Sequence, residues 1–424
     1  MLRWSRVRLY LSIITCEGLI ATMRERVQFT PNTKRYRSPK PSSKAQKSAA
    51  LTFEPPLWDY CGSLHVHSTY SDGAEPISGV AAAANEAGLD FVLMCDHSNL
   101  DAITDRQTGW SGSTLVIVGT EVTTDTGHLL AVDVEPDYLP SPHEAVAAQK
   151  HILDKGAIGF IALPCDLKDS WRDFSKHVDG IGLEVFNLSA IARTKINVLG
   201  FISIWRRYHS KHRMRAFHLV SARPDEELRL WDRMMRGENG QARKVVGIAC
   251  VDAHGVMKFM GKTYYFPTYK EVFQTLRTHV LLPTPLRASD DAGADAQNVH
   301  NAIRRGHCYM AYDNFADSQG FRFHALSSDG SAAATIMGDA ANISSGQGTF
   351  DLQAVTPKKK SFMRLLKNGE IVSSGPGNNL RYRCKGPGAY RVEAYLYKFR
   401  IGPLYFGVKP WIFSNPIYLA HSSN

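Results

Sequence analysis

Short apolar runs alternate with stretches of helical periodicity between residues 60 and 313. Apolar runs of four to eight residues, bounded by Gly, Asp and Asn, are typical of buried strands, and their alternation with helices is typical of β/α units. The runs that we expect to be strands are SLHV (63–66), DFVLMC (90–95), TLVIVG (114–119), HLLAVDV (128–134), AIGFIAL (157–163), GIGLEVF (180–186), RAFHLV (215–220) and KVVGIACV (244–251). The pattern predicts an α/β domain over residues 58–313.

One connecting helix has clear start and stop signals, in the segment SPHEAVAAQKHILDKG. Ser141 is expected to cap this helix, with Pro142 at its first position and Glu144 completing a capping box. Gly156 is expected to end it, because glycine adopts the left-handed conformation that terminates helices.

The pattern changes after residue 313. Runs such as GFRFHAL, TFDLQAV and AYRVEAYLY alternate apolar and polar positions and are separated by Gly, Pro and Asn. Asn368-Gly369 is a strong signal for a two-residue hairpin turn, and PWIFSNPIYLA is expected to supply the last strand. We therefore expect a small C-terminal antiparallel β-sandwich of immunoglobulin-like kind over residues 314–424, without a ligand site of its own.

Composition separates a basic tail from the rest of the chain. The hydrophobic content of 44% and charged content of 21% are ordinary for a globular protein, and the net charge is +10. Residues 1–50 hold eleven Lys and Arg against two Asp and Glu, which accounts for most of that charge. Residues 1–57 are rich in Lys, Arg, Ser and Pro, so we expect a disordered tail, with weak electrostatic binding to nucleic acid or anionic lipid as the alternative. No specific nucleic-acid partner is expected.

Cysteine use and the N-terminal residues bear on the compartment. Seven cysteines are scattered without a CxxC pair, as in reduced, cytoplasmic proteins. Three arginines precede the run LYLSIITCEGLIA, which resembles a weak export signal interrupted by Glu17. Cytoplasmic location is therefore the prediction and export the alternative. No run approaches the ~20 apolar residues of a membrane-spanning helix.

Metal-binding side chains occur at the ends of the apolar runs. His65 and His67 are two positions apart, so on a strand both imidazoles leave the same face. The other candidates are Asp72, His97, Glu121, His128, Asp252 and His254. A single HxH or Asp-His pair is more often an ordinary surface or core feature, but recurrence at successive strand ends favours a metal site. Imidazole and carboxylate together suit Zn, Mn or Fe.

These motifs resemble the polymerase and histidinol phosphatase (PHP) family of metal-dependent hydrolases. The resemblance rests on HVHSTYSDG, CDHS, GTE, GHLL and VDAHG and covers residues 60–313. The long C-terminal segment makes the chain more similar to the carbaryl-hydrolase-like branch than to short histidinol phosphatases. The resemblance implies a distorted seven-stranded β/α (TIM-like) barrel with two to three divalent metal ions at the C-terminal ends of its strands.

The resemblance also implies a role for each candidate ligand. His65, His67, Glu121 and Asp252 would surround a first ion. Glu121 would bridge to a second ion that His128 also holds, and a third would be held by Asp72, His97 and His254. Leu163 stands where the family usually has a histidine, which leaves the second site short of a ligand.

Five further residues are candidates for the pocket around these ions. Cys165 or Asp166 could supply the ligand missing at Leu163. Glu184 and Asn187 end a predicted strand and would line the pocket or cap the strand end, and Asp96 precedes a predicted ligand.

The expected activity follows from the metals. Our main hypothesis is that metal-bound hydroxide hydrolyses a small-molecule phosphate ester, with no catalytic side chain beyond the metal centre. One alternative is a carbamate, ester or amide hydrolase on the same centre. Another is a non-catalytic metal-binding protein, because of Leu163. The basic segment around Trp205 and Tyr208 is expected to be a solvated helix face, with a phosphate clamp as the alternative.

Overall fold

The computed structural model describes residues 56–166, 170–195, 198–236, 242–259, 262–327, 334–343, 350–384 and 386–421. The predicted basic tail therefore lies outside the described residues, apart from its last two positions. In the described ranges no helix has both the length and the apolar character needed to cross a membrane. The described residues up to Leu396 form one compact unit together with those from Lys409 onward, and residues 397–408 fall in another.

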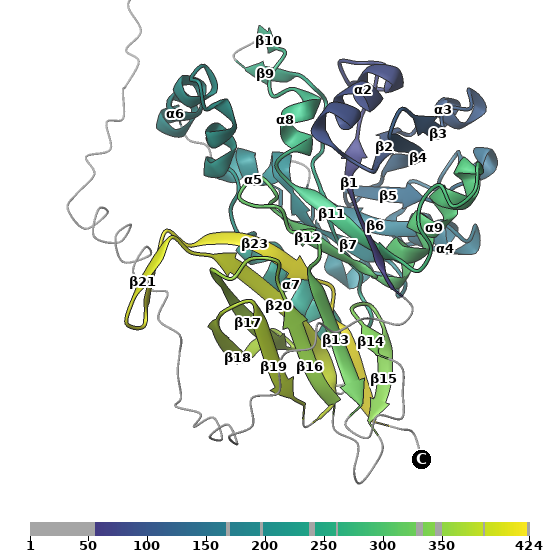
Figure 1. The fold of residues 1–424 in the computed structure, drawn as a ribbon. Coiled ribbons are helices and arrows are strands. Elements are labelled where there is room, and N and C mark those ends of the chain that lie inside the picture. Colours follow the sequence, from purple (N-terminus) through teal and green to yellow (C-terminus); the bar gives the residue numbers. More distant parts are fainter. Residues whose placement is uncertain are drawn as a thin grey trace, which may run out of the picture. The chain divides into compact units, whose positions relative to one another are not determined.

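The first part of the larger unit alternates strands and helices (Figure 1). Its strands are β1 (Trp58–Val66), β2 (Phe91–His97), β3 (Gly109–Ser111), β4 (Thr114–Thr123), β5 (His128–Val132), β6 (Ile158–Ala162), β7 (Gly182–Asn187), β8 (Gly247–Cys250), β9 (Met257–Phe259), β10 (Lys262–Tyr264), β11 (Arg277–Leu282) and β12 (Cys308–Ala311). Its helices are α2 (Ile77–Ala87), α3 (Asp101–Thr104), α4 (Ala145–Asp154), α5 (Leu188–Lys195), α6 (Val198–Tyr208), α7 (Asp225–Arg236), α8 (Tyr269–Phe273) and α9 (Ala292–Arg305), with short 3-10 turns η1 (Pro136–Tyr138), η2 (Phe174–Lys176) and η3 (Arg213–Leu219).

Seven of the eight runs expected to be strands are strands, in the order β1-β2-β4-β5-β6-β7-β8 across the sheet. The prediction for RAFHLV is wrong, because this run lies in η3 and just beyond it. Its buried residues, Ala216, Phe217 and Val220, have the i, i+1, i+4 spacing of a helical turn rather than the alternation of a strand.

The strand directions depart from an all-parallel barrel. The pairs β1–β2, β2–β4, β6–β7 and β7–β8 are parallel, whereas β4–β5 and β5–β6 are antiparallel. The short turn at residues 124–127 joins β4 to β5, and so short a connection permits only antiparallel pairing. The architecture is mixed α/β. A closed barrel of seven strands stays a prediction, because the sheet continues past β1 into β11, β12 and β23 (Lys409–Ser414).

The two ends of this strand order nevertheless meet. An isolated parallel bridge joins Val66 of β1 to Ala253 just after β8. The amide of Val251 donates to the carbonyl of Leu64 at 3.1 Å, and the amide of His67 donates to the carbonyl of Ala253 at 3.0 Å. The segment after β8 is thus held against the end of β1 by backbone hydrogen bonds.

Helices pack on the strands of this sheet. α2 contacts β2 and β4, α4 contacts β6, α7 contacts β7, and α9 contacts β11. The N-terminal cap of α4 differs from the prediction. Glu144 itself is the N-cap and accepts from the amides of Val146 and Ala147 at 3.1 and 2.7 Å, so α4 begins later than Ser141 and Pro142 suggested. Gly156, at a φ of 73°, follows the helix as expected.

The C-terminal part is antiparallel in most of its pairings. Its strands are β13 (Arg322–Ser327), β14 (Thr335–Ile336), β15 (Ala340–Ile343), β16 (Phe350–Val355), β17 (Ser361–Lys367), β18 (Glu370–Pro376), β19 (Asn379–Arg383), β20 (Gly388–Leu396), β23 and β24 (Ile417–His421). One sheet has the order β14-β13-β16-β19, and a second contains β15, β24, β20, β23, β17 and β18. Side chains from both sheets share a core that includes Phe323, Leu352, Leu365 and Val392.

Two details of this part were predicted from local signals. The hairpin at Asn368-Gly369 is confirmed, since Lys367 pairs with Glu370 across it and both turn residues have positive φ. PWIFSNPIYLA forms two strands rather than one, because the extended structure is interrupted at Asn415 between β23 and β24. β23 pairs with β12, so one sheet continues across the expected boundary at residue 313, and that boundary stays a prediction.

The separate segment 397–408 is a β-hairpin. Strands β21 (Phe399–Ile401) and β22 (Leu404–Phe406) pair antiparallel, and the rings of Phe399 and Phe406 stack with centroids 4.8 Å apart.

A buried histidine links β1 and β11 to the residues that follow β12. His279 is 2% exposed, and its Nδ1 and Nε2 atoms lie 3.0 Å from carboxylate oxygens of Asp59 and Asp313 respectively. Ser318 lies within 3.1 Å of the same Nε2, and Arg322 donates to Asp59 at 2.8 Å. Burial lowers the pKa of His279, but the two carboxylates outweigh it and raise the pKa to about 9.

This pKa predicts how stability depends on pH. A histidine whose pKa rises on folding contributes stability that is fully present below its ordinary pKa of 6.5 and is lost as the pH rises through about 9. We expect His279→Gln to lower the free energy of unfolding by about 3 kcal/mol near pH 7. The deficit should shrink between pH 7 and 9.5, as measured by urea unfolding.

The exposed His143→Gln variant is the matched control and should follow the wild-type protein throughout. A deficit for His279→Gln that stays constant over this pH range would show that its protonation does not stabilise the fold.

Candidate metal centre

The candidate ligands come from strand ends at one edge of the sheet. His65 is near the end of β1 and His67 directly follows it, while Glu121 lies in the last part of β4. His97 pairs in register with Glu121 across β2 and β4, and Asp252 follows β8. Because the segment after β8 is bonded to β1, residues almost 190 positions apart in the chain become neighbours.

Glu121 is at the centre of these side chains. Its Oε2 atom lies 3.1 Å from Nε2 of His65, 3.4 Å from Nε2 of His67 and 3.2 Å from Nδ1 of His97. Its Oε1 atom lies 3.3 Å from Nδ1 of His128. Glu121 is only 2% exposed, so a single buried carboxylate contacts four imidazoles.

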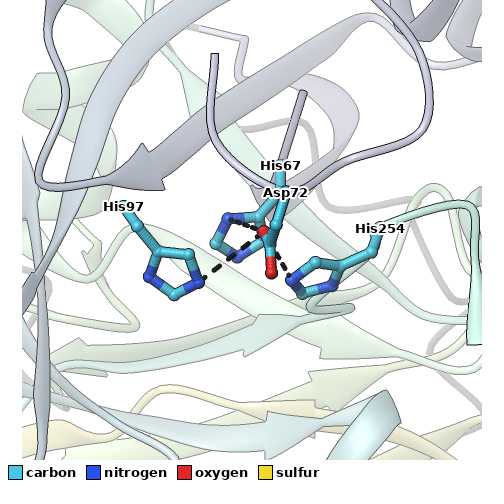
Figure 2. Close-up of side chains that lie close together, drawn as sticks. All are labelled: His67, Asp72, His97 and His254. Carbon is cyan, nitrogen blue, oxygen red and sulfur yellow. Dashed lines mark ion pairs between the residues drawn. The ribbon is translucent and has the colours of Figure 1, made fainter. Parts of the chain in front are cut away.

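A second group of side chains gathers around Asp72, as Figure 2 shows. One carboxylate oxygen of Asp72 lies 3.2 Å from Nε2 of His254, 3.7 Å from Nε2 of His97 and 3.8 Å from Nδ1 of His67. His67 and His97 belong to both groups. The ligand atoms within each candidate group all lie within 4.8 Å of one another, and the groups are His67/Asp72/His97/His254, His65/His67/Glu121, His97/Glu121/His128 and His65/Glu184/Cys250.

Asp252 joins the two groups. Its Oδ1 atom lies 3.5 Å from Nε2 of His67, 3.6 Å from Nδ1 of His254 and 3.8 Å from Nε2 of His65. All eight predicted ligands are therefore brought together, although their binding of metal stays a proposal.

Two buried nitrogen atoms test whether a cation fits this site. The Nε2 atoms of His65 and His67 are buried and make no hydrogen bond within the described residues. Both lie close to Oε2 of Glu121, at 3.1 and 3.4 Å, but a buried imidazole nitrogen that makes no hydrogen bond is costly. Both atoms point to the place where carboxylate oxygens of Glu121 and Asp252 converge, and this donor set of nitrogen and oxygen atoms is suited to a divalent ion.

The charges of the site depend on one another. Burial raises the pKa of Glu121, but the nearby imidazoles outweigh it and lower the pKa to about 2. The Asp72 carboxylate is hydrogen-bonded to His254, which lowers its pKa to about 2. Burial lowers the pKa of His65, but Glu121 and Glu184 outweigh it and raise the pKa well above its usual value. The carboxylates are thus ionised at neutral pH, as metal ligands must be.

Three strand-end residues at the site have left-handed backbone conformations. The φ angles are 61° for His65, 49° for Leu163 and 52° for Asp252. Such angles are uncommon for residues other than glycine and cluster where function constrains the backbone. They turn the chain sharply at the points where side chains must converge.

Asp96 holds the loop that carries Asp72. Its carboxylate accepts from the amide of Ser68 at 2.7 Å and from the hydroxyls of Ser68 and Ser71 at 2.8 and 2.6 Å. Gly73 closes this loop, and a Cβ atom there would lie 2.5 Å from the carbonyl oxygen of His67. Asp96 therefore positions the loop, and it belongs to none of the candidate ligand groups found among the described residues.

Glu184 and Asn187 have different positions. Glu184 is fully buried, and its Oε1 atom lies 2.9 Å from Nδ1 of His65. Its Oε2 atom accepts from the amide of Leu163 at 2.7 Å. Asn187 caps α5 by accepting from the amide of Ala190 at 2.8 Å. Glu184 thus touches a predicted ligand, whereas Asn187 has the capping role.

Neither of the two proposed substitutes for a histidine at position 163 joins the candidate ligands. Leu163 is 5% exposed and packs in the apolar core. Burial, followed by Glu227 and Glu226, raises the pKa of Cys165 to about 12, so its thiol is neutral. Asp166 forms an ion pair with Arg193 at 3.0 Å. Neither Cys165 nor Asp166 belongs to a candidate ligand group in the described part of the chain.

Cys250, which was not predicted at the site, forms a candidate group with His65 and Glu184. Two further unpredicted residues, Tyr269 and Arg193, contact the site from other elements. The hydroxyl of Tyr269 lies 2.8 Å from the carbonyl oxygen of His67 and 2.9 Å from that of His254, so it ties two ligand-bearing loops together. Arg193 on α5 lies 3.7 Å from Asp252. Neither has a local sequence signal, because both act across elements that only the fold brings together.

No model of a protein family matches the chain, and no curated protein matches it. Similar solved structures include a two-domain protein from Bacteroides vulgatus containing a predicted PHP-like metal-dependent phosphoesterase, with 14% identity, a TM-score of 0.37 and coverage of 84% of this chain and 95% of that chain.

Two further solved structures are similar at the same level. PsfC from Pseudomonas syringae has 12% identity and a TM-score of 0.35, over 60% of this chain and 93% of that chain. An amidohydrolase from Chromobacterium violaceum with bound sulfate and no metal has 14% identity and a TM-score of 0.27, over 49% of this chain and 92% of that chain. These values are too low to assign a family or to transfer an activity.

The shared ligands predict an order of metal loss. After loading with Mn²⁺ or Zn²⁺ and desalting, we expect Asp72→Asn to retain less metal than the wild-type protein, because one group loses its carboxylate. Glu121→Gln should retain less still, because Glu121 contacts four imidazoles. Elemental analysis of the purified proteins measures this order.

Glu86→Gln is the matched control, since Glu86 is exposed and pairs with Lys270 on the surface. Equal metal content in Glu121→Gln and Glu86→Gln would mean that Glu121 is not a ligand.

Proposed function

We propose that the chain is a metal-dependent phosphoesterase that hydrolyses a small-molecule phosphate ester. The observation that carries this proposal is the sharing of Glu121, through which two candidate ion positions adjoin. Oε2 of Glu121 lies beside His65, His67 and His97, and Oε1 lies beside His128. A carboxylate with imidazoles at both oxygens can hold two ions close together, as in two-metal phosphate-ester hydrolases.

The chain's own residues prepare the site. The Glu184 carboxylate accepts a hydrogen bond from Nδ1 of His65, which leaves Nε2 of that ring directed toward Glu121. Asp96 and Tyr269 hold the loops that carry Asp72 and His254 in place. Bound divalent ions would supply a Lewis acid and activate water for attack.

The same ligand pattern supports placing the chain among PHP hydrolases as part of this proposal. The carbaryl-hydrolase-like branch, the identity and number of the ions, and the cytoplasmic location stay predictions. Two alternatives compete with this proposal. One is hydrolysis of carbamates, esters or amides at the same centre, and the other is metal binding without catalysis.

A parallel assay distinguishes these outcomes. We expect the protein loaded with Mn²⁺ or Zn²⁺ to hydrolyse aryl phosphate mono- or diesters faster than matched aryl carbamates. Glu121→Gln should lower kcat/KM by about 100-fold or more, because several kcal/mol of charge stabilisation is removed. Glu86→Gln should retain wild-type activity.

Faster turnover of the carbamates would instead support the carbonyl hydrolase. A fully loaded protein that turns over neither class would support metal binding without catalysis.

A further inference from the structure

A basic segment without acidic residues follows β7. Between Glu184 and Asp225 the sequence contains eight Lys and Arg and no Asp or Glu. The rest of residues 51–424 holds 31 Lys and Arg against 38 Asp and Glu. Arg213 and Arg223 pair with Glu271 and Glu393 from elsewhere in the chain. Other side chains of the segment are exposed and carry positive charge that attracts anions, namely Arg206, Arg207, Lys211 and Arg215. We call residues 185–224 the basic segment.

The basic segment reaches the metal centre through Arg193. This residue lies on α5, which directly follows β7. Its Nε atom donates to buried Asp166 at 3.0 Å, and its Nη1 atom donates to Ser189 at 3.1 Å. Its Nη2 atom lies 3.7 Å from Oδ2 of Asp252. Two hydrogen bonds therefore hold the guanidinium at ion-pair distance from a candidate ligand.

The Asp252 carboxylate lies between this guanidinium and the imidazoles. Oδ1 of Asp252 faces His67 and His254, whereas Oδ2 faces Arg193. One carboxylate thus separates the fixed positive charge of Arg193 from the atoms that would hold the ions.

A purely structural ion pair explains this geometry poorly. An arginine that only neutralises Asp166 would present its two-pronged edge to that carboxylate. Arg193 instead uses only Nε for Asp166 and turns its terminal nitrogens toward Ser189 and Asp252. Each terminal nitrogen carries two N–H groups, so one on each has no partner among the described residues. The Arg193 side chain as a whole is 38% exposed.

We propose that Arg193 is the anion-binding residue of the site and that it binds a non-bridging oxygen of a tetrahedral oxyanion such as a phosphate ester. This inference rests on the proposed function and narrows it to substrates with a negative charge beside the scissile bond. A guanidinium with donors on both terminal nitrogens suits such oxygens, and the basic segment brings the anion to it.

The test measures binding of inorganic phosphate to the metal-loaded protein by calorimetry. We expect Arg193→Gln to weaken phosphate binding by about tenfold or more. Arg193→Lys should weaken it less, because lysine keeps the positive charge but loses the paired N–H donors of the guanidinium. Arg207→Gln is the matched control, since it removes one exposed charge from the same segment and should change binding less than about twofold. Acetate should compete weakly in the wild-type protein.

Metal content and turnover complete the test. Arg193→Gln should keep its metal, and it should raise KM for an aryl phosphate by a larger factor than it lowers kcat. Equal weakening of phosphate binding by Arg207→Gln would show that the positive charge of the whole segment attracts phosphate, and it would overturn the proposal. Unchanged phosphate binding in Arg193→Gln, or loss of its metal, would also overturn it. So would acetate binding to the wild-type protein as tightly as phosphate. Phosphate binding needs no turnover, so failure of the proposed activity is seen separately.

Discussion

The site depends on the backbone hydrogen bonds between β1 and the segment after β8. The carbonyl of Leu64 accepts from Val251 at 3.1 Å, and His67 donates to Ala253 at 3.0 Å. The carbonyl of His65 also accepts from the amide of Ala253 at 3.3 Å, so the two segments lie side by side and Asp252 comes close to His65 and His67. The left-handed φ angles of His65 and Asp252 are the local cost of this arrangement, and they persist because the bonds on either side hold the chain.

Buried charge is the second constraint. Glu121 is 2% exposed, and an isolated carboxylate at such a position would be strongly destabilising. Four imidazoles around it offset that penalty, and the same imidazoles lower its pKa to about 2. The imidazoles and the carboxylate can therefore share the site only if their charges balance. The buried Nε2 atoms of His65 and His67, which have no hydrogen-bond partner among the described residues, mark where a cation would complete that balance.

The sequence predicted those features of the fold and the site that depend on neighbouring residues, and it did not predict those that depend on contacts between distant elements. Seven strands followed from apolar runs, and the turn at Asn368 and Gly369 followed from residue type. RAFHLV was misread because a run of six apolar and polar residues does not distinguish a strand from a helical turn. The candidate ligands could be found because they lie at the ends of apolar runs or close to them in the sequence. Arg193 and Tyr269 could not, because nothing in the residues beside them indicates that α5 and α8 reach the loops after β8 and β1.

The apolar residue at position 163 and the arginine at position 193 together change the character of the site. Leu163 packs in the core, and its backbone amide still donates to Glu184, so the local backbone keeps its place without supplying a ligand. Nearby, Asp166 holds Arg193 with its charge toward Asp252. A guanidinium keeps its positive charge at neutral pH, so it supplies positive charge to the site without a bound metal ion. Positive charge on this side of the centre is thus built into the chain, whereas on the side of Glu121 and Asp72 it depends on what the imidazoles and carboxylates bind.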